Sequence, residues 1–168
     1  LPIVEKIKDS IPTVEHIIVF TDDETLPQTA LPNVTLYEQF IQDGNENFEF
    51  MKNIPENSPA GMCYTSATTG NPKGVLYTHR SIVLHSMTIG LADTLALSES
   101  DVAMPVVPMF HVNAWGIPFS AVSLGTTLVL PGPNFTPQVL AELIDEEKVT
   151  MTAGVPTIWI ELAKLLET

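Results

Sequence analysis

The sequence predicts an α/β fold for residues 60–168, in which strand-helix units alternate and a largely parallel sheet is flanked by helices. From Gly61 onward, short apolar runs of strand length alternate with longer segments of helical periodicity. The strand candidates are almost continuously apolar, as parallel strands covered on both faces must be. No charged residue occurs from Val102 to Ala141. Prolines interrupt this run, and its longest proline-free piece, Phe119–Leu130, is far shorter than the ~20 residues that cross a bilayer.

Residues 1–59 are expected to form a separate, acidic and loop-rich segment with one strand. The run His16–Phe20 is apolar and of strand length, and it follows an amphipathic stretch, Leu1–Asp9. The remainder of the segment is rich in turn formers and poorly periodic. It is expected to be a connection with one short helix near Leu36–Gln42.

The elements expected after residue 59 follow one another without a long break. The strands are Gly61–Thr65, Val75–Tyr77, Asp101–Met109, Thr127–Leu130 and Val149–Val155. The helices are Thr78–Leu95, Ala114–Leu124, Thr136–Glu147 and Pro156–Leu166. Thr78 and Thr136 are suited to cap the helices that they begin, and Pro156 fits the first turn of the last helix.

Composition excludes several classes of function. The chain has 168 residues, with 20 acidic against 7 basic side chains and a net charge of −13. A protein this acidic is not expected to bind nucleic acid or an anionic membrane, because both require a basic face. The lone cysteine, Cys63, excludes an intrachain disulfide, and no export signal opens the chain. Both observations favour a reducing, cytoplasmic compartment.

Two features indicate that the chain is a fragment. The mean hydropathy is +0.21, which is high for an acidic domain and predicts that part of the apolar surface is covered by sequence outside this chain. The last expected helix also reaches the final residues without a C-cap glycine.

The most informative stretch is the loop after the first strand of the α/β segment. Tyr64–Gly74 reads YTSATTGNPKG, with four hydroxyl side chains in five residues followed by glycine, lysine and glycine. Backbone N–H groups and short hydroxyls can surround phosphate oxygens, and Lys73 adds a mobile positive charge in a region with a single acid. The spacing differs from that of the Walker loop and of the dinucleotide fingerprint. A polar turn of no function remains the alternative to a phosphate site.

The longer string Tyr64–Arg80, YTSATTGNPKGVLYTHR, resembles the phosphate-binding signature of AMP-forming adenylating enzymes. These are the acyl-CoA synthetases, luciferases and peptide-synthetase adenylation domains. The resemblance implies that this chain is part of their larger N-terminal domain. It also implies that one set of residues surrounds the β- and γ-phosphates of ATP, with one hydroxyl on Mg²⁺. The phosphate set is Ser66, Thr68, Thr69, Gly70 and Lys73, and the Mg²⁺ hydroxyl is that of Thr65. Ala67 stands where the family pattern has glycine.

A second string, Val106–Gly116 (VVPMFHVNAWG), suggests an apolar channel with one polar group at its mouth. On spacing alone, His111 can equally cap a strand and Trp115 can belong to the core. The string is similar to the second signature of long-chain fatty-acid–CoA ligases. That resemblance implies that His111 lies near the fatty carboxylate and the phosphates, that Val112 lines the acyl pocket, and that Trp115 gates it.

The resemblance implies an acid–thiol ligase that converts a long- or medium-chain fatty acid to acyl-AMP and transfers it to CoA. Its cofactors and substrates would be ATP, Mg²⁺ and CoA, with Lys73 and His111 as catalytic residues. The family's adenine, ribose and adenylation-lysine motifs are not found in the sequence, so the isolated fragment is expected to be inactive. An enzyme for an aryl or amino acid, and a non-catalytic α/β binding module, remain alternatives. A homodimer and a peripheral membrane contact of the full-length protein are left open.

Overall fold

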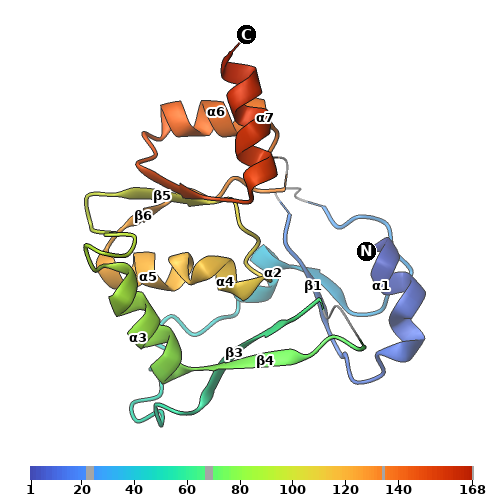
Figure 1. The fold of residues 1–168 in the computed structure, drawn as a ribbon. Helices are drawn as coiled ribbons and strands as arrows, with labels where there is room; N and C mark the ends of the chain where they lie inside the picture. The colour runs from blue at the N-terminus through green and yellow to red at the C-terminus, as the bar shows by residue number, and fades with distance from the viewer. Residues whose placement is uncertain (22–24, 67–69, 134, 168) are drawn as a thin grey trace. The chain divides into compact units, whose positions relative to one another are not determined.

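The computed structural model describes residues 1–21, 25–66, 70–133 and 135–167. Two compact units are present, residues 1–52 and residues 53–168, and Figure 1 labels their elements. In the described part of the chain, no helix is both long enough and apolar enough to cross a membrane.

The first unit contains a small parallel sheet. The expected strand is present as β1 (Ile17–Val19), and it pairs in parallel with a second strand, β2 (Val34–Leu36), which the sequence did not predict. Three residues are too few to show the alternating pattern of a strand in the sequence, so β2 is identified only by its pairing with β1. The helices are α1 (Pro2–Ile7), the 3₁₀ helix η1 (Lys8–Ser10) and α2 (Tyr37–Ile41).

The second unit begins with a hairpin. Strand β3 (Pro59–Tyr64) pairs in an antiparallel manner with β4 (Gly74–Thr78), and the paired ends are Tyr64 and Gly74. These two strands therefore stand apart from the parallel sheet. The physical reason is the connection: residues 65–73 are too few for the crossover of a dozen or more residues that parallel pairing needs.

The parallel sheet of the second unit has the order β6-β5-β7. Its strands are β5 (Val102–Pro105), β6 (Thr127–Leu128) and β7 (Met151–Ala153). Helices α6 (Pro137–Glu146) and α7 (Pro156–Leu166) lie on one face, and α5 (Ile117–Leu124) lies on the other (Figure 1). The prediction of an α/β fold with a parallel sheet flanked by helices is confirmed.

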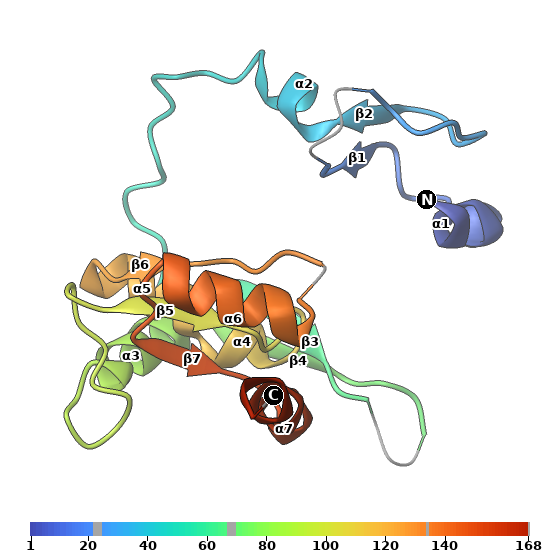
Figure 2. The same ribbon diagram turned by 90° about the horizontal axis from the view of Figure 1, so that it is seen from above.

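The main core lies on both faces of β5. Ala103 and Met104 are completely buried neighbours on this strand, and successive side chains of a strand point to opposite faces. Ala103 packs with Ile117 and residues near α5, whereas Met104 packs with Leu140 of α6 and near Trp159 of α7. Figure 2 shows α6 lying along the sheet. The uncharged run of the sequence thus supplies both faces of this core, although Phe110 and Val122 of the same run are exposed.

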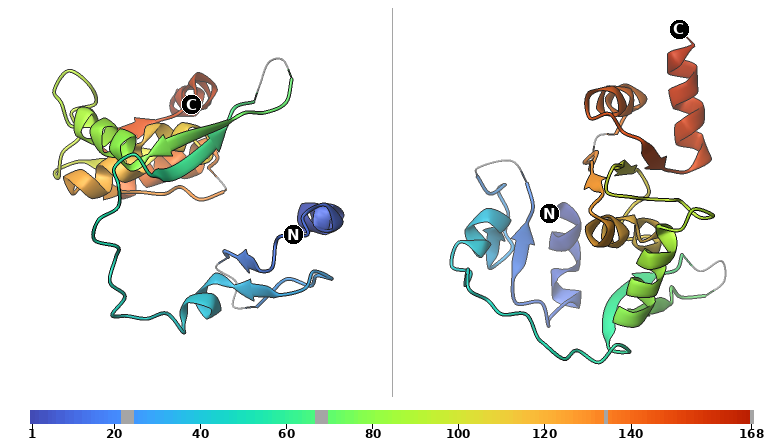
Figure 3. Two further views of the ribbon diagram at one scale, coloured as in Figure 1. Left: turned by 90° about the horizontal axis from the view of Figure 1, so that it is seen from below. Right: turned by 90° about the vertical axis from the view of Figure 1, so that its left-hand side faces the viewer.

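Helix α3 (His79–Ile89) begins where the sequence predicts and ends sooner than expected. The Thr78 side chain accepts a hydrogen bond from the Ser81 N–H, and the Ser81 hydroxyl oxygen accepts one from the Thr78 N–H. These two bonds form a capping box. The helix stops at Ile89 instead of near Leu95, and Gly90 is its C-cap residue. The Thr94 hydroxyl lies within hydrogen-bond distance of the Thr88 and Ile89 carbonyl oxygens at this end. The hairpin and α3 lie on the side of the sheet away from α6 and α7 (Figure 3).

The helix expected at Ala114–Leu124 is the largest local correction. The regular helix α5 begins only at Ile117, with Gly116 as its N-cap and Pro118 in its first turn. The preceding residues form a separate turn, α4 (Val112–Trp115), whose backbone is left-handed.

Candidate functional site

Two hydrogen bonds between Thr65 and Lys73 close the base of the hydroxyl- and glycine-rich loop. The Thr65 backbone N–H donates to the Lys73 carbonyl oxygen at 2.9 Å, and the Lys73 N–H donates to the Thr65 hydroxyl oxygen at 3.3 Å. Gly70 adopts a φ of +91°, a conformation that side chains other than glycine rarely take. Thr65, Ser66, Gly70 and Lys73 are all exposed on this loop. These described residues of the loop are therefore accessible to a ligand at the end of the hairpin.

The remaining residues of the predicted phosphate set are Thr68 and Thr69. Both lie outside the described residues, as does Ala67, where the sequence departs from the family pattern.

The two basic side chains near this loop have different environments. Arg80 forms a two-pronged ion pair with Glu56, with N···O distances of 2.7 and 2.8 Å. Among the described residues, no carboxylate lies within ion-pair distance of the Lys73 ammonium group. Lys73 is thus the cation of this region that is available to an anionic ligand, whereas Arg80 is already neutralised.

The turn α4 carries two of the residues predicted for the acyl pocket. Val112, Asn113, Ala114 and Trp115 have φ values of +51°, +51°, +49° and +56°. A left-handed helical backbone costs L-residues roughly 1–2 kcal/mol per residue. The surrounding structure must therefore hold this turn in place. Ala114 is completely buried, and three hydrogen bonds anchor its neighbours.

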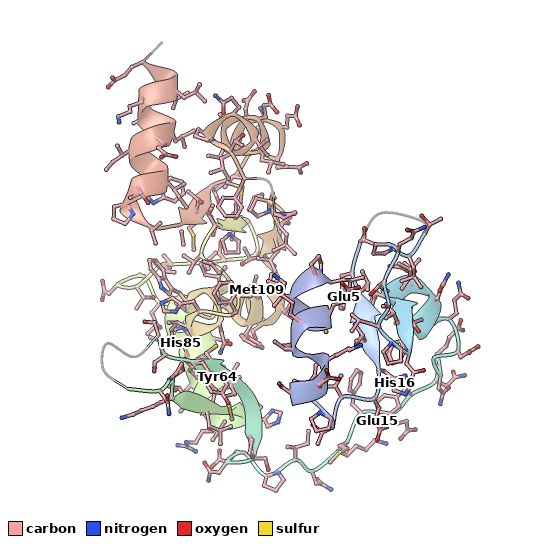
Figure 4. All side chains as sticks on the ribbon, turned by 90° about the vertical axis from the view of Figure 1, so that its right-hand side faces the viewer. Glu5, Glu15, His16, Tyr64, His85 and Met109 are labelled. Atoms are coloured by element: carbon pink, nitrogen blue, oxygen red, sulfur yellow. The ribbon has the colours of Figure 1, made fainter. Side chains whose placement is uncertain are left out.

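Those anchors reach the turn from two other elements. The His85 Nε2 atom on α3 lies 2.9 Å from the carbonyl oxygen of Trp115, and because a carbonyl oxygen only accepts, the Nε2–H group donates to it. The Cys63 thiol on β3 donates to Asn113 Oδ1 at 3.2 Å. Within the turn, the Gly116 N–H donates to the Asn113 carbonyl oxygen. Figure 4 labels His85 on α3, and Tyr64, the residue after Cys63 on β3.

A mainly apolar cavity of about 290 Å³ lies between α3, the end of β4 and the turn. Its volume is at the lower end of the range typical of small-molecule sites. The structure brings Val112 and Trp115 together in its wall, as the sequence resemblance implies. Its lining residues are Tyr77, Ser81, Ile82, His85, Ser86, Val112, Asn113, Trp115, Gly116 and Phe119.

The structure does not place His111 in this cavity wall. His111 is exposed and is the N-cap of the turn, where its carbonyl oxygen accepts from the Ala114 N–H. Its side chain therefore lies outside the lining of this cavity.

Sequence reasoning missed the opposite wall, which consists mostly of α3 side chains. Ser81 and His85, and likewise Ile82 and Ser86, are four residues apart, so each pair lies on one helical face. Two serine hydroxyls and the His85 imidazole beside Ile82 were the available signal, although that spacing alone does not indicate what the face meets.

The loop and the cavity share the same hairpin. Tyr77, in the cavity wall, lies four residues after Lys73 along an extended segment, which separates their Cα atoms by about 13 Å. An anion on the loop and an apolar tail in the cavity can therefore belong to one reaction centre. In the described residues, no group of three His, Cys, Asp or Glu side chains is arranged to hold a metal ion.

Comparison with known proteins agrees with this arrangement. The sequence profile of the AMP-binding enzymes matches residues 1–168. The chain belongs to the AMP-binding enzyme family. A long-chain-fatty-acid–CoA ligase of Thermus thermophilus is 48% identical over 99% of the chain. A medium-chain-fatty-acid–CoA ligase of Ectopseudomonas oleovorans is 47% identical over 95% of it. The chain covers 29% of the length of either relative.

Solved structures of this family share the fold. A long-chain-fatty-acid–CoA ligase from Archaeoglobus fulgidus matches with a TM-score of 0.72 and 29% identity, covering 98% of this chain and 34% of that one. An o-succinylbenzoate CoA synthetase from Bacillus subtilis, solved with ATP and magnesium ion, matches with a TM-score of 0.66 and 26% identity. The alignment covers 96% of this chain and 32% of the synthetase.

Proposed function

We propose that the protein containing this chain is an AMP-forming ligase that activates a medium- or long-chain fatty acid and transfers it to CoA. One observation carries the proposal: Val112 and Trp115 line an apolar cavity on a chain that is 47–48% identical to ligases named for medium- and long-chain fatty acids. The exposed loop on the same hairpin supplies the hydroxyl, glycine and lysine groups that suit a polyphosphate.

The reaction has two steps that balance without an oxidant or reductant. A carboxylate oxygen of the acid attacks the α-phosphorus of ATP, and the bond to the bridging oxygen breaks, which gives acyl-AMP and pyrophosphate. The CoA thiol then loses its proton to solvent and its sulfur attacks the acyl carbon. AMP leaves as the bond between the acyl carbon and the phosphate oxygen breaks. Mg²⁺ bound with ATP neutralises phosphate charge.

Each of the predicted site residues has a role in this proposal. Lys73 offsets the charge that develops on the leaving pyrophosphate, together with the hydroxyl and glycine residues of its loop. Thr65 contributes its hydroxyl oxygen to the magnesium ion of MgATP. His111 acts at the carboxylate end, Val112 contacts the acyl chain, and Trp115 opens or fills the cavity. The proposed site of action is the cytoplasm.

A second candidate is a ligase for a short acid. A 3-methylmercaptopropionyl-CoA ligase of Ruegeria pomeroyi is 44% identical over 95% of the chain, and the cavity of about 290 Å³ is small. This candidate differs from the first only in the length of acid that the completed pocket accepts.

The test is ATP–pyrophosphate exchange by the full-length protein with a panel of acids. The panel contains octanoate, palmitate, 3-methylmercaptopropionate, an aryl acid and an amino acid. Fastest exchange with octanoate or palmitate is the expected result. Fastest exchange with 3-methylmercaptopropionate selects the second candidate. Preference for an aryl or amino acid, or no exchange with any acid, would overturn the proposal.

A further inference from the structure

A single side-chain contact joins the strand that leads into the loop to the turn that carries the gate. The Cys63 thiol donates to Asn113 Oδ1 across 3.2 Å, although the two residues are 50 positions apart in the sequence. Cys63 is 7% exposed, on β3, two residues before Thr65. The end of this strand is therefore tied directly to the turn at Asn113.

The backbone at Asn113 explains why this contact matters. Asn113 has φ +51° and ψ +39°, and asparagine is among the non-glycine residues that best tolerate this conformation. Val112 and Trp115 of the same turn are a β-branched and a bulky residue, and for such residues this conformation is a genuine outlier. Asn113 is thus the favourable residue in a turn whose other members resist it.

The position of Asn113 links it to the gate as well. It lies between Val112 and Trp115 in sequence and lines the same cavity. Rotation of the Asn113 peptide units would redirect both neighbouring side chains. The His85 hydrogen bond holds the carbonyl end of the turn, at Trp115, and the Cys63 hydrogen bond holds its middle.

We propose that Asn113 is a positioning residue of the acyl gate, and that its hydrogen bond from Cys63 holds Val112 and Trp115 in the acid-accepting geometry. This inference rests on the proposed function, because it assigns the contact to fatty-acid binding. Asn113 acts through its neighbours and through the strand that precedes Thr65.

The experiment uses four variants of the full-length protein. Cys63→Ala removes the donor, Cys63→Ser keeps a hydroxyl donor, and Asn113→Gly removes the acceptor while still permitting the left-handed backbone. The fourth variant combines Cys63→Ala with Asn113→Gly. For each variant, the rate of acyl-adenylate formation is measured against octanoate concentration at saturating MgATP, with the thermal unfolding midpoint measured in parallel.

Loss of the contact is expected to raise the KM for octanoate about fivefold in Cys63→Ala and in Asn113→Gly, with a smaller change in kcat. The double variant is expected to match either single variant, because both remove the same interaction. Cys63→Ser is expected to stay within about twofold of the wild-type KM, since it restores the donor.

Three results would overturn the inference. A KM within about twofold of wild type in Cys63→Ala, even with a lowered unfolding midpoint, would show a structural role alone. Multiplied effects in the double variant would show that the two side chains act independently. A Cys63→Ser variant as impaired as Cys63→Ala would exclude the hydrogen bond. If Asn113→Gly does not fold, the comparison of Cys63→Ala with Cys63→Ser decides.

The wild-type protein separates this inference from the proposed function. Exchange with fatty acids but an unchanged KM in the variants refutes only the role of Asn113. A wild-type protein that activates no fatty acid overturns both.

Discussion

The imidazole of His85 lies directly against Gly116, so closely that a Cβ atom added there would displace the ring. A Cβ atom on Gly116 would lie 2.5 Å from His85 Cδ2 and 2.8 Å from Nε2. The same imidazole donates to the carbonyl oxygen of Trp115, the preceding residue. Glycine at position 116 thus permits both the positive φ of +71° and the close approach of α3 to the turn α4.

Replacing Gly116 by alanine is expected to destabilise the protein through two effects. The positive φ costs roughly 1–2 kcal/mol, and displacement of the His85 ring adds about 1–3 kcal/mol. Gly132→Ala is the matched control, because Gly132 has a φ of +69° with no atom near the added Cβ. Urea unfolding of the full-length protein measures both losses. Equal losses would show that contact with His85 contributes nothing.

Lys73→Ala is expected to slow acyl-adenylate formation by about tenfold or more, because the leaving pyrophosphate loses a compensating charge. Lys148→Ala is the control. Lys148 forms an exposed ion pair with Asp145 at 3.3 Å, and such pairs contribute little. Steady-state kinetics of pyrophosphate exchange decide the matter. A rate for Lys73→Ala that equals the control would favour the non-catalytic binding module.

Thr65→Val is expected to raise the KM for MgATP by about tenfold, because valine has the same shape but cannot accept from the Lys73 N–H. It also removes the hydroxyl proposed for magnesium. Thr65→Ser keeps the oxygen and is expected to remain near wild type. Initial rates at varied MgATP compare the three proteins. If valine and serine gave the same KM, the hydroxyl at position 65 would have no role in binding the nucleotide.

The pH dependence of stability is expected to include a contribution from Asp101. The Ser98 hydroxyl, the Thr150 hydroxyl and the Ser98 N–H donate to its carboxylate and lower its pKa from the ordinary value of 3.8. Because the folded-state pKa is the lower one, the stabilisation is complete above the unfolded-state value. It is lost as the pH falls through the folded-state pKa.

The measurement compares wild type with Asp101→Asn by urea unfolding from pH 7 down into the acid range. The stability difference is expected to be constant near neutral pH and to shrink below about pH 3.8. Ser98→Ala removes the largest cause of the shift and is expected to lose part of the effect. A difference that did not vary with pH would rule out the carboxylate charge as its source.

The sequence predicted those parts of the fold that depend on local pattern. Thr78 and Thr136 cap helices in the structure as their chemistry predicted, and Pro156 begins α7. The prediction carried α3 on to Leu95, although Gly90, its C-cap residue in the structure, is a local signal for the end of the helix. The turn at Val112–Trp115 was hidden, since nothing in VNAW indicates four left-handed residues.

What the sequence determined by itself is the chemistry of the loop and the α/β class, because hydroxyl, glycine and lysine spacing and apolar runs are local properties of the chain. The tertiary structure decided which groups meet. The cavity joins residues of α3 to a turn about 30 positions later, and Cys63 reaches Asn113 across 50 positions. It also places His111 at the exposed start of the turn, where its role at the carboxylate end of the pocket stays a prediction. Such pairings depend on how helices pack against the sheet, and no short-range spacing encodes them.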